Sequence, residues 1–192
     1  HIITKAATNK VISSYVIGVL SGFYLMTPTS AAEPWVEERL TDALEHQKAG
    51  RYSEALEAFT LIIEEGGSKQ MDNNQLATLA FNEGLCFLAQ AEAQASQEPK
   101  AALGLVMQAR SRFLNARRMK PDFDRAGQRL DPVAQMIADY QKQISEAEQR
   151  QQDIEEKMQE LIEMLQELLK RQIELRNDVP SRSQQHRGPA SQ

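Results

Sequence analysis

Residues 109–121 have the sequence Ala109-Arg-Ser-Arg-Phe113-Leu-Asn-Ala116-Arg-Arg-Met-Lys-Pro121. Residues three and four apart lie on one face of a helix, so Ala109, Phe113 and Ala116 form an apolar stripe. The two alanines let a second helix approach closely, and the phenyl ring fills the groove opposite. Pro121 cannot continue a helix, so the helix is expected to end before it. The stretch therefore predicts a helix that packs against a neighbouring helix.

A similar stripe occurs earlier in the chain, in Lys48-Ala-Gly50-Arg-Tyr52-Ser-Glu-Ala55-Leu-Glu-Ala-Phe59-Thr-Leu-Ile62. Ala55, Phe59 and Ile62 have the spacing of the first stripe, and Gly50 marks a break before them. Both stretches resemble the tetratricopeptide (TPR) repeat, in which a Gly-x-Tyr turn joins two antiparallel helices. Such helix pairs stack because one pair cannot bury its apolar face alone.

The resemblance covers about residues 35–121 and implies two TPR-like helix pairs, a fragment of an α-solenoid. Gly84 and Phe87 match the first helix of the second pair. Arg39 and His46 depart from the family pattern, which has large apolar or aromatic residues at those places. The packing positions that the resemblance implies are Ala55, Phe59, Ile62, Gly84, Phe87, Ala109, Phe113, Ala116 and Pro121.

Proline and glycine divide the chain after residue 33 into helical segments. Asp72 and Gln75 have the spacing of a capping box, and Asp131 before Pro132 has the pattern of a helix start. We find no alternating run of β-branched residues, so we expect an all-α protein without a sheet. The expected helices are residues 35–49, 53–65, 73–94, 99–119, 122–130 and 132–177.

The last of these segments carries an apolar stripe with the period of a coiled coil. In steps of three and four from Ile137 to Leu175, ten of twelve positions are apolar, and Gln151 and Gln172 are the exceptions. The two glutamines are candidates to set the register or the oligomeric state. The expected contact positions of this seam are Ile144, Ile154, Met158, Leu161, Leu165, Leu168 and Leu175.

The seam can be buried in two ways. We expect its first turns, with Val133, Met136, Ile137 and Tyr140, to cap the repeat unit. Beyond Ile144 we favour pairing with another copy or another coiled coil, because a heptad pattern of this length exceeds what capping requires. The alternative is that the whole helix folds back over the repeats.

Residues 1–32 have the pattern of a secretory signal peptide. Lys5 and Lys10 precede an uncharged apolar run, and small residues that include Ala31 and Ala32 suit cleavage. The run is shorter than the ~20 residues of a membrane-spanning helix. The alternative is an uncleaved N-terminal anchor. The remaining domains that we expect are a repeat domain at residues 33–131, a long coiled-coil helix at residues 132–177 and a disordered tail at residues 178–192.

The composition argues against an enzyme and against a nucleic-acid binder. One cysteine and three scattered histidines cannot form a disulfide framework or a cysteine-based metal cluster. The net charge is −5, and without the two lysines of residues 1–32 the chain has 20 basic and 27 acidic residues, a net of −7. Phosphate binding needs clustered basic residues instead. We expect Cys86 to be a core residue, and we assign no catalytic, cofactor-binding or metal-binding residue.

A TPR domain followed by a Gln- and Glu-rich coiled coil is similar to the small exported TPR proteins of bacterial Bat-type (aerotolerance) operons. The resemblance implies a scaffold for protein–protein interaction in the cell envelope. We expect partners among envelope or membrane proteins and a homo-oligomer formed through the coiled coil. The expected place is the periplasm, or the inner membrane if the N-terminal segment is retained. The alternative is a structural accessory of a cell-wall, division or secretion complex.

Overall fold

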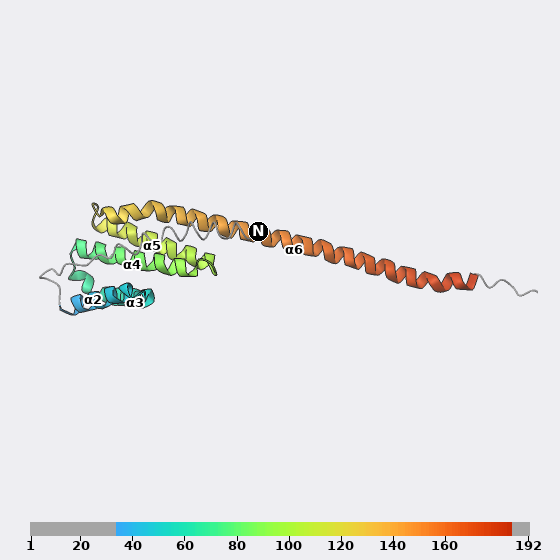
Figure 1. The fold of residues 1–192 in the computed structure, drawn as a ribbon, viewed down its shortest axis with the longest axis horizontal. Coiled ribbons are helices and arrows are strands. Elements are labelled where there is room, and N and C mark those ends of the chain that lie inside the picture. The colour runs from blue at the N-terminus through green and yellow to red at the C-terminus, as the bar shows by residue number, and fades with distance from the viewer. Residues whose placement is uncertain (1–33, 186–192) are drawn as a thin grey trace, which may run out of the picture. The chain divides into compact units, whose positions relative to one another are not determined.

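The computed structural model describes residues 34–185, and in this range the chain is helical without a β-strand. Its elements are α2 (Pro34–Lys48), α3 (Tyr52–Glu64), the short 3-10 helix η2 (Gly67–Lys69), α4 (Asn73–Gln94), α5 (Pro99–Met119) and α6 (Asp124–Gln185). The all-α prediction is confirmed, and Figure 1 shows these helices along the chain. The predicted signal segment, residues 1–32, and the end of the predicted tail, residues 186–192, lie outside the described range.

Helices α2 to α5 begin and end where local signals predict. The Asp72 carboxylate accepts a hydrogen bond from the Gln75 backbone N–H (2.7 Å), and the Gln75 side chain accepts one from the Asp72 backbone N–H (3.0 Å). This reciprocal pair is the predicted capping box at the start of α4. Gly50 and Gly66, in the turns that follow α2 and α3, have φ values of 75° and 87°, a region that glycine enters without steric cost.

The helices pack in sequence order, α2 on α3, α3 on α4 and α4 on α5. An ion pair of 3.1 Å joins Arg39 near the start of α2 to Glu65 just after α3. Similarly, the ammonium of Lys120 after α5 donates to the Asn74 side chain at the start of α4 (2.8 Å). The helices of each pair therefore run in opposite directions.

Two clusters of buried apolar side chains form the core, and α4 contributes to both. The first cluster lies between α2, α3 and α4 and contains Val36, Leu40, Ala43, Leu44, Ala55, Ala58, Phe59, Ile62, Met71, Leu79 and Cys86. The second cluster joins α4, α5 and the start of α6 and contains Ala77, Ala80, Phe81, Leu85, Leu88, Ala91, Ala102, Val106, Ala109, Phe113, Ala116, Phe123, Ala126, Val133 and Tyr140. Helix α4 is thus the central helix of the unit, buried on two faces.

The predicted helix boundary at Asp131–Pro132 is wrong. One helix, α6, begins at Asp124 and continues through both residues, so Asp131 is not a helix cap. A proline inside a helix removes a backbone hydrogen bond and costs ~3 kcal/mol. Phe123 and Ala126 before Pro132, and Val133 after it, are buried in the second cluster. We attribute the continuity to this shared packing, which holds both sides of the proline on the same helix.

The described chain forms two compact units, residues 34–144 and residues 145–185. Val133 and Tyr140 are buried in the first unit, and Met136 and Ile137 pack against its second cluster, as expected for the first turns of the seam. Helix α6 also includes residues 178–185, so the prediction that the disordered tail begins at residue 178 is wrong. None of the helices in the described range combines the length and apolarity needed to cross a membrane.

Candidate functional site

The structure places most of the TPR-like packing positions inside the two core clusters. Ala55, Phe59 and Ile62 on α3 have no exposed surface. Ala109, Phe113 and Ala116 on α5 are equally buried. Of the remaining positions, Gly84 is buried, Phe87 is half-buried against the second cluster, and Pro121 is exposed in the turn between α5 and α6. These residues thus build the first unit, and only Phe87 and Pro121 reach its surface.

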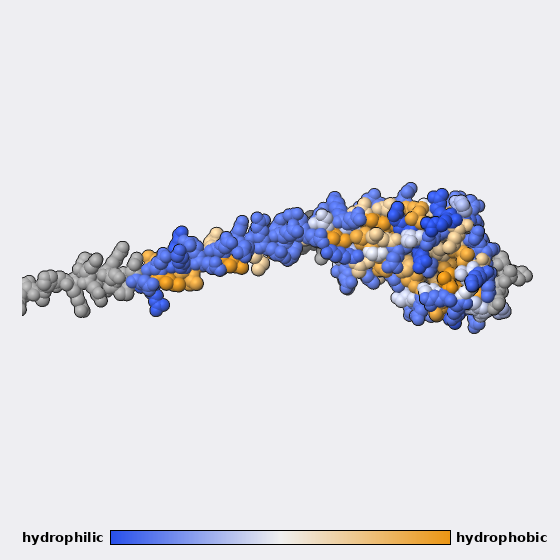
Figure 2. All heavy atoms as spheres, turned by 180° about the vertical axis from the view of Figure 1, so that it is seen from behind, coloured by the Kyte–Doolittle hydropathy of each residue, from blue (hydrophilic) through white to orange (hydrophobic). Residues whose placement is uncertain are grey.

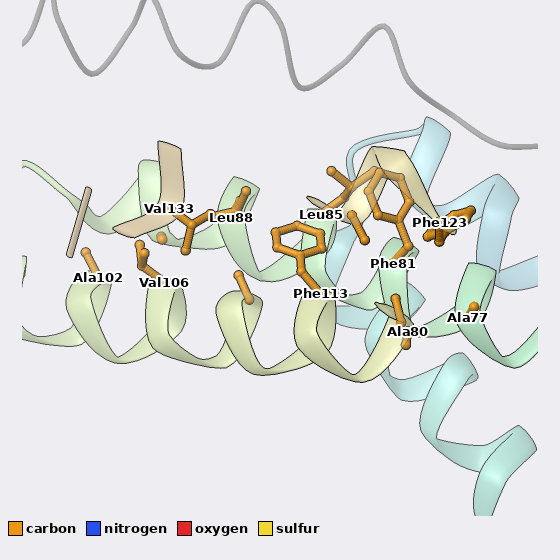
Figure 3. Close-up of a cluster of buried hydrophobic side chains, with 14 of the residues drawn as sticks. Ala77, Ala80, Phe81, Leu85, Leu88, Ala102, Val106, Phe113, Phe123 and Val133 are labelled. Carbon is orange, nitrogen blue, oxygen red and sulfur yellow. The ribbon is translucent and has the colours of Figure 1, made fainter. Parts of the chain in front are cut away.

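The contact between α4 and α5 depends on an aromatic group that Figure 3 shows in detail. The rings of Phe81 and Phe113 lie with their centroids 5.5 Å apart, and Phe123 meets Phe81 edge-on at 5.4 Å. Offset and edge-to-face pairs of this kind add to the energy of apolar burial. Phe81 belongs to α4 and Phe113 to α5, and Phe123 directly precedes α6. The three rings therefore pack these three segments against one another.

Buried polar groups on α4 form a feature that the sequence analysis missed. Asn82 is fully buried, and its backbone carbonyl accepts a hydrogen bond from the Gln47 side chain of α2 (3.2 Å). Both polar atoms of the Asn82 side chain, and the Gln47 side-chain oxygen, have no hydrogen-bond partner among residues 34–177. Thr78 lies buried one turn earlier. The signal in the sequence was the apolar character of α4 on several faces, which predicts a central helix whose polar residues are buried too.

Glu83, beside Asn82, is a buried carboxyl group. Only 3% of the residue is exposed, and the Arg112 guanidinium of α5 lies 3.4 Å from its carboxylate. Burial raises the pKa of Glu83 to about 7, although Arg112 acts in the opposite direction. The carboxyl group therefore changes its charge near neutral pH.

Cys86 lies one turn after Glu83 and Asn82 and is the cysteine of the first core cluster. Burial, with a smaller contribution from the Glu83 carboxylate, raises the pKa of the Cys86 thiol to about 12. The thiol is the form present at neutral pH, whereas nucleophilic cysteines are thiolates. Cys86 acts in this structure as a small apolar core residue.

The basic stretch at the end of α5 is partly occupied by contacts within the first unit. Arg112 pairs with Glu83, and Arg118 donates to the Asn115 side chain (3.1 Å). Lys120 lies over the Phe123 ring, 5.9 Å from its centroid, in addition to its bond to Asn74. Arg112 thus joins the middle of α4 to α5, whereas the contacts of Lys120 link the start of α4 to the turn after α5.

The second unit carries the seam on a single helix. Ile144, at the end of the first unit, is half-buried, whereas Ile154, Met158, Leu161, Leu165, Leu168 and Leu175 are between 53% and 68% exposed. Ile162, Met164, Leu169 and Ile173 are exposed beside them and widen the stripe. Figure 2 shows hydrophobic residues gathered along one edge of this helix. Among the residues whose side chains the structure describes, the seam is therefore an exposed apolar surface.

Polar side chains of the second unit bond to one another along the helix. The Gln151 side chain donates to the Glu155 carboxylate (2.8 Å), and Arg171 pairs with Glu167 at 3.1 Å, as their spacing predicts. Gln159 donates to Glu163 in the same way (3.1 Å). Contacts of this kind support a lone helix but do not cover its apolar edge.

The described part of the first unit includes an open hollow of about 620 Å³ beside Trp35 on α2 and another of about 360 Å³ beside Arg117 on α5. Among residues 34–177, whose side chains the structure describes, there is no group of three His, Cys, Asp or Glu side chains that could hold a metal ion. No protein-family model, curated protein or solved structure matches the chain.

Proposed function

We propose that this chain is an exported scaffold of the bacterial cell envelope, in which a TPR-like unit binds protein partners and a coiled coil joins copies of the chain. The observation that carries the proposal is the exposed seam of residues 145–177. It lies on a regular helix, keeps the heptad spacing, and is more than half exposed at each of its apolar contact positions from Ile154 to Leu175.

The first unit supports the scaffold part of the proposal. Oppositely directed helix pairs, α2 with α3 and α4 with α5, stack through the contact of α3 with α4. Of the small and aromatic residues of the TPR-like pattern, all but Phe87 are buried. Stacked helix pairs present extended surfaces for protein partners, which is the use that the TPR resemblance implies.

Export is tested by cell fractionation. The full chain, with a C-terminal epitope tag, is expressed in a Gram-negative bacterium, and the cytoplasmic, periplasmic and membrane fractions are probed. We expect the tag in the periplasm or, with residues 1–32 retained, in the inner membrane facing the periplasm. A tag confined to the cytoplasm would contradict the proposal. A variant with Val16→Asp and Leu20→Asp in the apolar run should stay in the cytoplasm, because charges disrupt a signal segment.

Partner binding is tested separately from self-association. The tagged chain is used to capture proteins from envelope extracts, in parallel with a Leu161→Ala, Leu165→Ala variant. Partners of the first unit should be captured by both, at a lower yield for the variant if several copies act together. If no protein is enriched over an unrelated tagged chain, the scaffold role is wrong.

A further inference from the structure

We infer that the seam pairs with the same seam of a second copy of this chain, in parallel and in register. The inference rests on the proposed self-association and adds the partner, the direction and the alignment. It is carried by the size of the apolar surface, by the positions of two glutamines in the seam, and by the charges that flank it.

The size of the exposed surface fits a partner as long as the seam itself. The ten large apolar side chains between Ile154 and Leu175 expose on the order of 1,000 Å² on one helix. The largest apolar patch of a monomeric protein is roughly 300–600 Å². Two such surfaces facing one another reach the range of roughly 1,200–2,000 Å² that stable interfaces bury.

The seam consists of two series of positions that alternate along α6. The first series contains both glutamines, in the order Ile144, Gln151, Met158, Leu165 and Gln172. The second series is apolar throughout, with Ala147, Ile154, Leu161, Leu168 and Leu175. In a parallel pair each series faces itself, whereas in an antiparallel pair each series faces the other.

The glutamines therefore distinguish the two directions. In a parallel pair in register, Gln151 faces Gln151 of the second copy, and the two amides can bond to each other, as buried polar seam residues do. A shift by one heptad places Gln151 against Met158 instead. In an antiparallel pair every alignment within the second unit places Gln151 and Gln172 against aliphatic side chains, which offer these amides no hydrogen bond across the interface.

The flanking charges favour the same direction. The side of the seam that precedes the first series carries Arg150, Lys157 and Arg171, and the opposite side carries Glu148 and Glu155. In a parallel pair these two sides face each other, so Arg150 meets Glu155 of the second copy, twice by symmetry. An antiparallel pair places each side against itself and brings cations together. One like-charged contact, Arg171 with Arg176, remains in the parallel arrangement.

Disulfide cross-linking tests the direction in the full chain. Cys86→Ala first removes the native thiol, and then Ile154→Cys and Leu165→Cys are made as separate single-cysteine variants in that background. In the parallel pair each new cysteine faces its own copy, so each variant expressed alone forms a disulfide-linked dimer. In the most overlapped antiparallel pair, residue 154 faces residue 165, so only cells that express both variants form a disulfide.

Positions 154 and 165 lie about 16 Å apart along a helix with a rise of 1.5 Å per residue. In the parallel pair this distance is too long for a disulfide between the two positions. After mild oxidation in cells and a non-reducing gel, we expect linked dimers of each variant alone and no 154–165 product. Linkage only in the mixed cells would overturn the direction while leaving self-association intact. No linkage in any of the strains would overturn self-association as well. Gln159→Cys, on the opposite side of the helix, is the control that should remain unlinked.

Discussion

The phenyl ring of Phe113 on α5 occupies the space beside Gly84 on α4. A β-carbon added to Gly84 would lie 2.5 Å from Cε1 of Phe113, closer than such contacts allow. Phe113 is fully buried, so its ring cannot turn away into solvent. The close approach of α4 and α5 therefore depends on glycine at this position.

Gly84→Ala should destabilise the first unit by about 1–3 kcal/mol, the usual effect of overpacking a core. Urea unfolding followed by circular dichroism measures the change. Gly104→Ala on the exposed face of α5 is the matched control, because a β-carbon there meets nothing within 4 Å. That variant should gain roughly 0.5–1 kcal/mol from helix propensity. Equal effects of the two substitutions would show that the Phe113 contact is unimportant.

Because the Glu83 carboxyl group is buried, we expect the free energy of unfolding to depend on pH. Its pKa is raised from 4.5 to about 7 in the folded chain, so the folded state binds a proton that the unfolded state has lost. The stabilisation is complete below pH 4.5 and is lost as the pH rises through about 7, by up to about 3 kcal/mol. We expect the free energy of unfolding of the native chain, relative to Glu83→Gln, to fall between pH 5 and pH 8. A difference that stays constant or rises over this range would contradict the assignment.

Because Pro132 lies inside α6, we expect its replacement by alanine to increase stability. In Pro132→Ala the new backbone N–H can bond to the Gln128 carbonyl, so α6 regains the hydrogen bond that proline removes. The first unit should be stabilised by about 1–3 kcal/mol in thermal or urea unfolding. Pro121, which lies in a turn, provides the control, and Pro121→Ala should change stability by less than about 1 kcal/mol. Destabilisation by Pro132→Ala would mean that α6 is interrupted at this residue.

Gln151→Leu tests the role that we infer for the facing Gln151 amides in the seam. An apolar residue at this position should stabilise the oligomer by about 1–3 kcal/mol and make its direction less specific. Combined with the cysteine variants, it should allow the 154–165 disulfide to appear beside the two like-residue products. Gln152→Leu, one residue away and outside the seam, should leave the cross-linking pattern unchanged. If Gln151→Leu leaves the cross-linking pattern unchanged, Gln151 does not set the direction of pairing.

The helices of the first unit were predictable because their boundaries depend on local chemistry. The capping box of Asp72 and Gln75, the turn glycines and Pro99 act within a few residues of each boundary. The boundary at Pro132 was mispredicted because Asp131–Pro132 has the local pattern of a helix start. Packing of Phe123 and Val133 against helices far away in the sequence decides the outcome there.

The exposed seam could be predicted from the sequence, whereas the buried polar residues could not. The seam follows from the heptad spacing alone, since one helix needs no tertiary information. The buried polar group of Gln47, Asn82 and Glu83 was missed, because it exists only where α4 lies between two layers of helices. Gln47 lies on α2, whereas Asn82 and Glu83 lie on α4, so the whole of α3 separates them in the sequence. No spacing rule connects residues that far apart.

If the exposed seam joins copies of the chain, the mass measured by sedimentation equilibrium must depend on the apolar residues of the seam. The full chain in mild detergent is compared with Leu161→Ala, Leu165→Ala and with the control Gln159→Ala, Glu163→Ala on the polar side of the same helix. We predict an oligomer for the native chain and the control, and a monomer with an unchanged first unit for the seam variant. A native chain that sediments as a monomer, or a seam variant that remains an oligomer, would contradict the account.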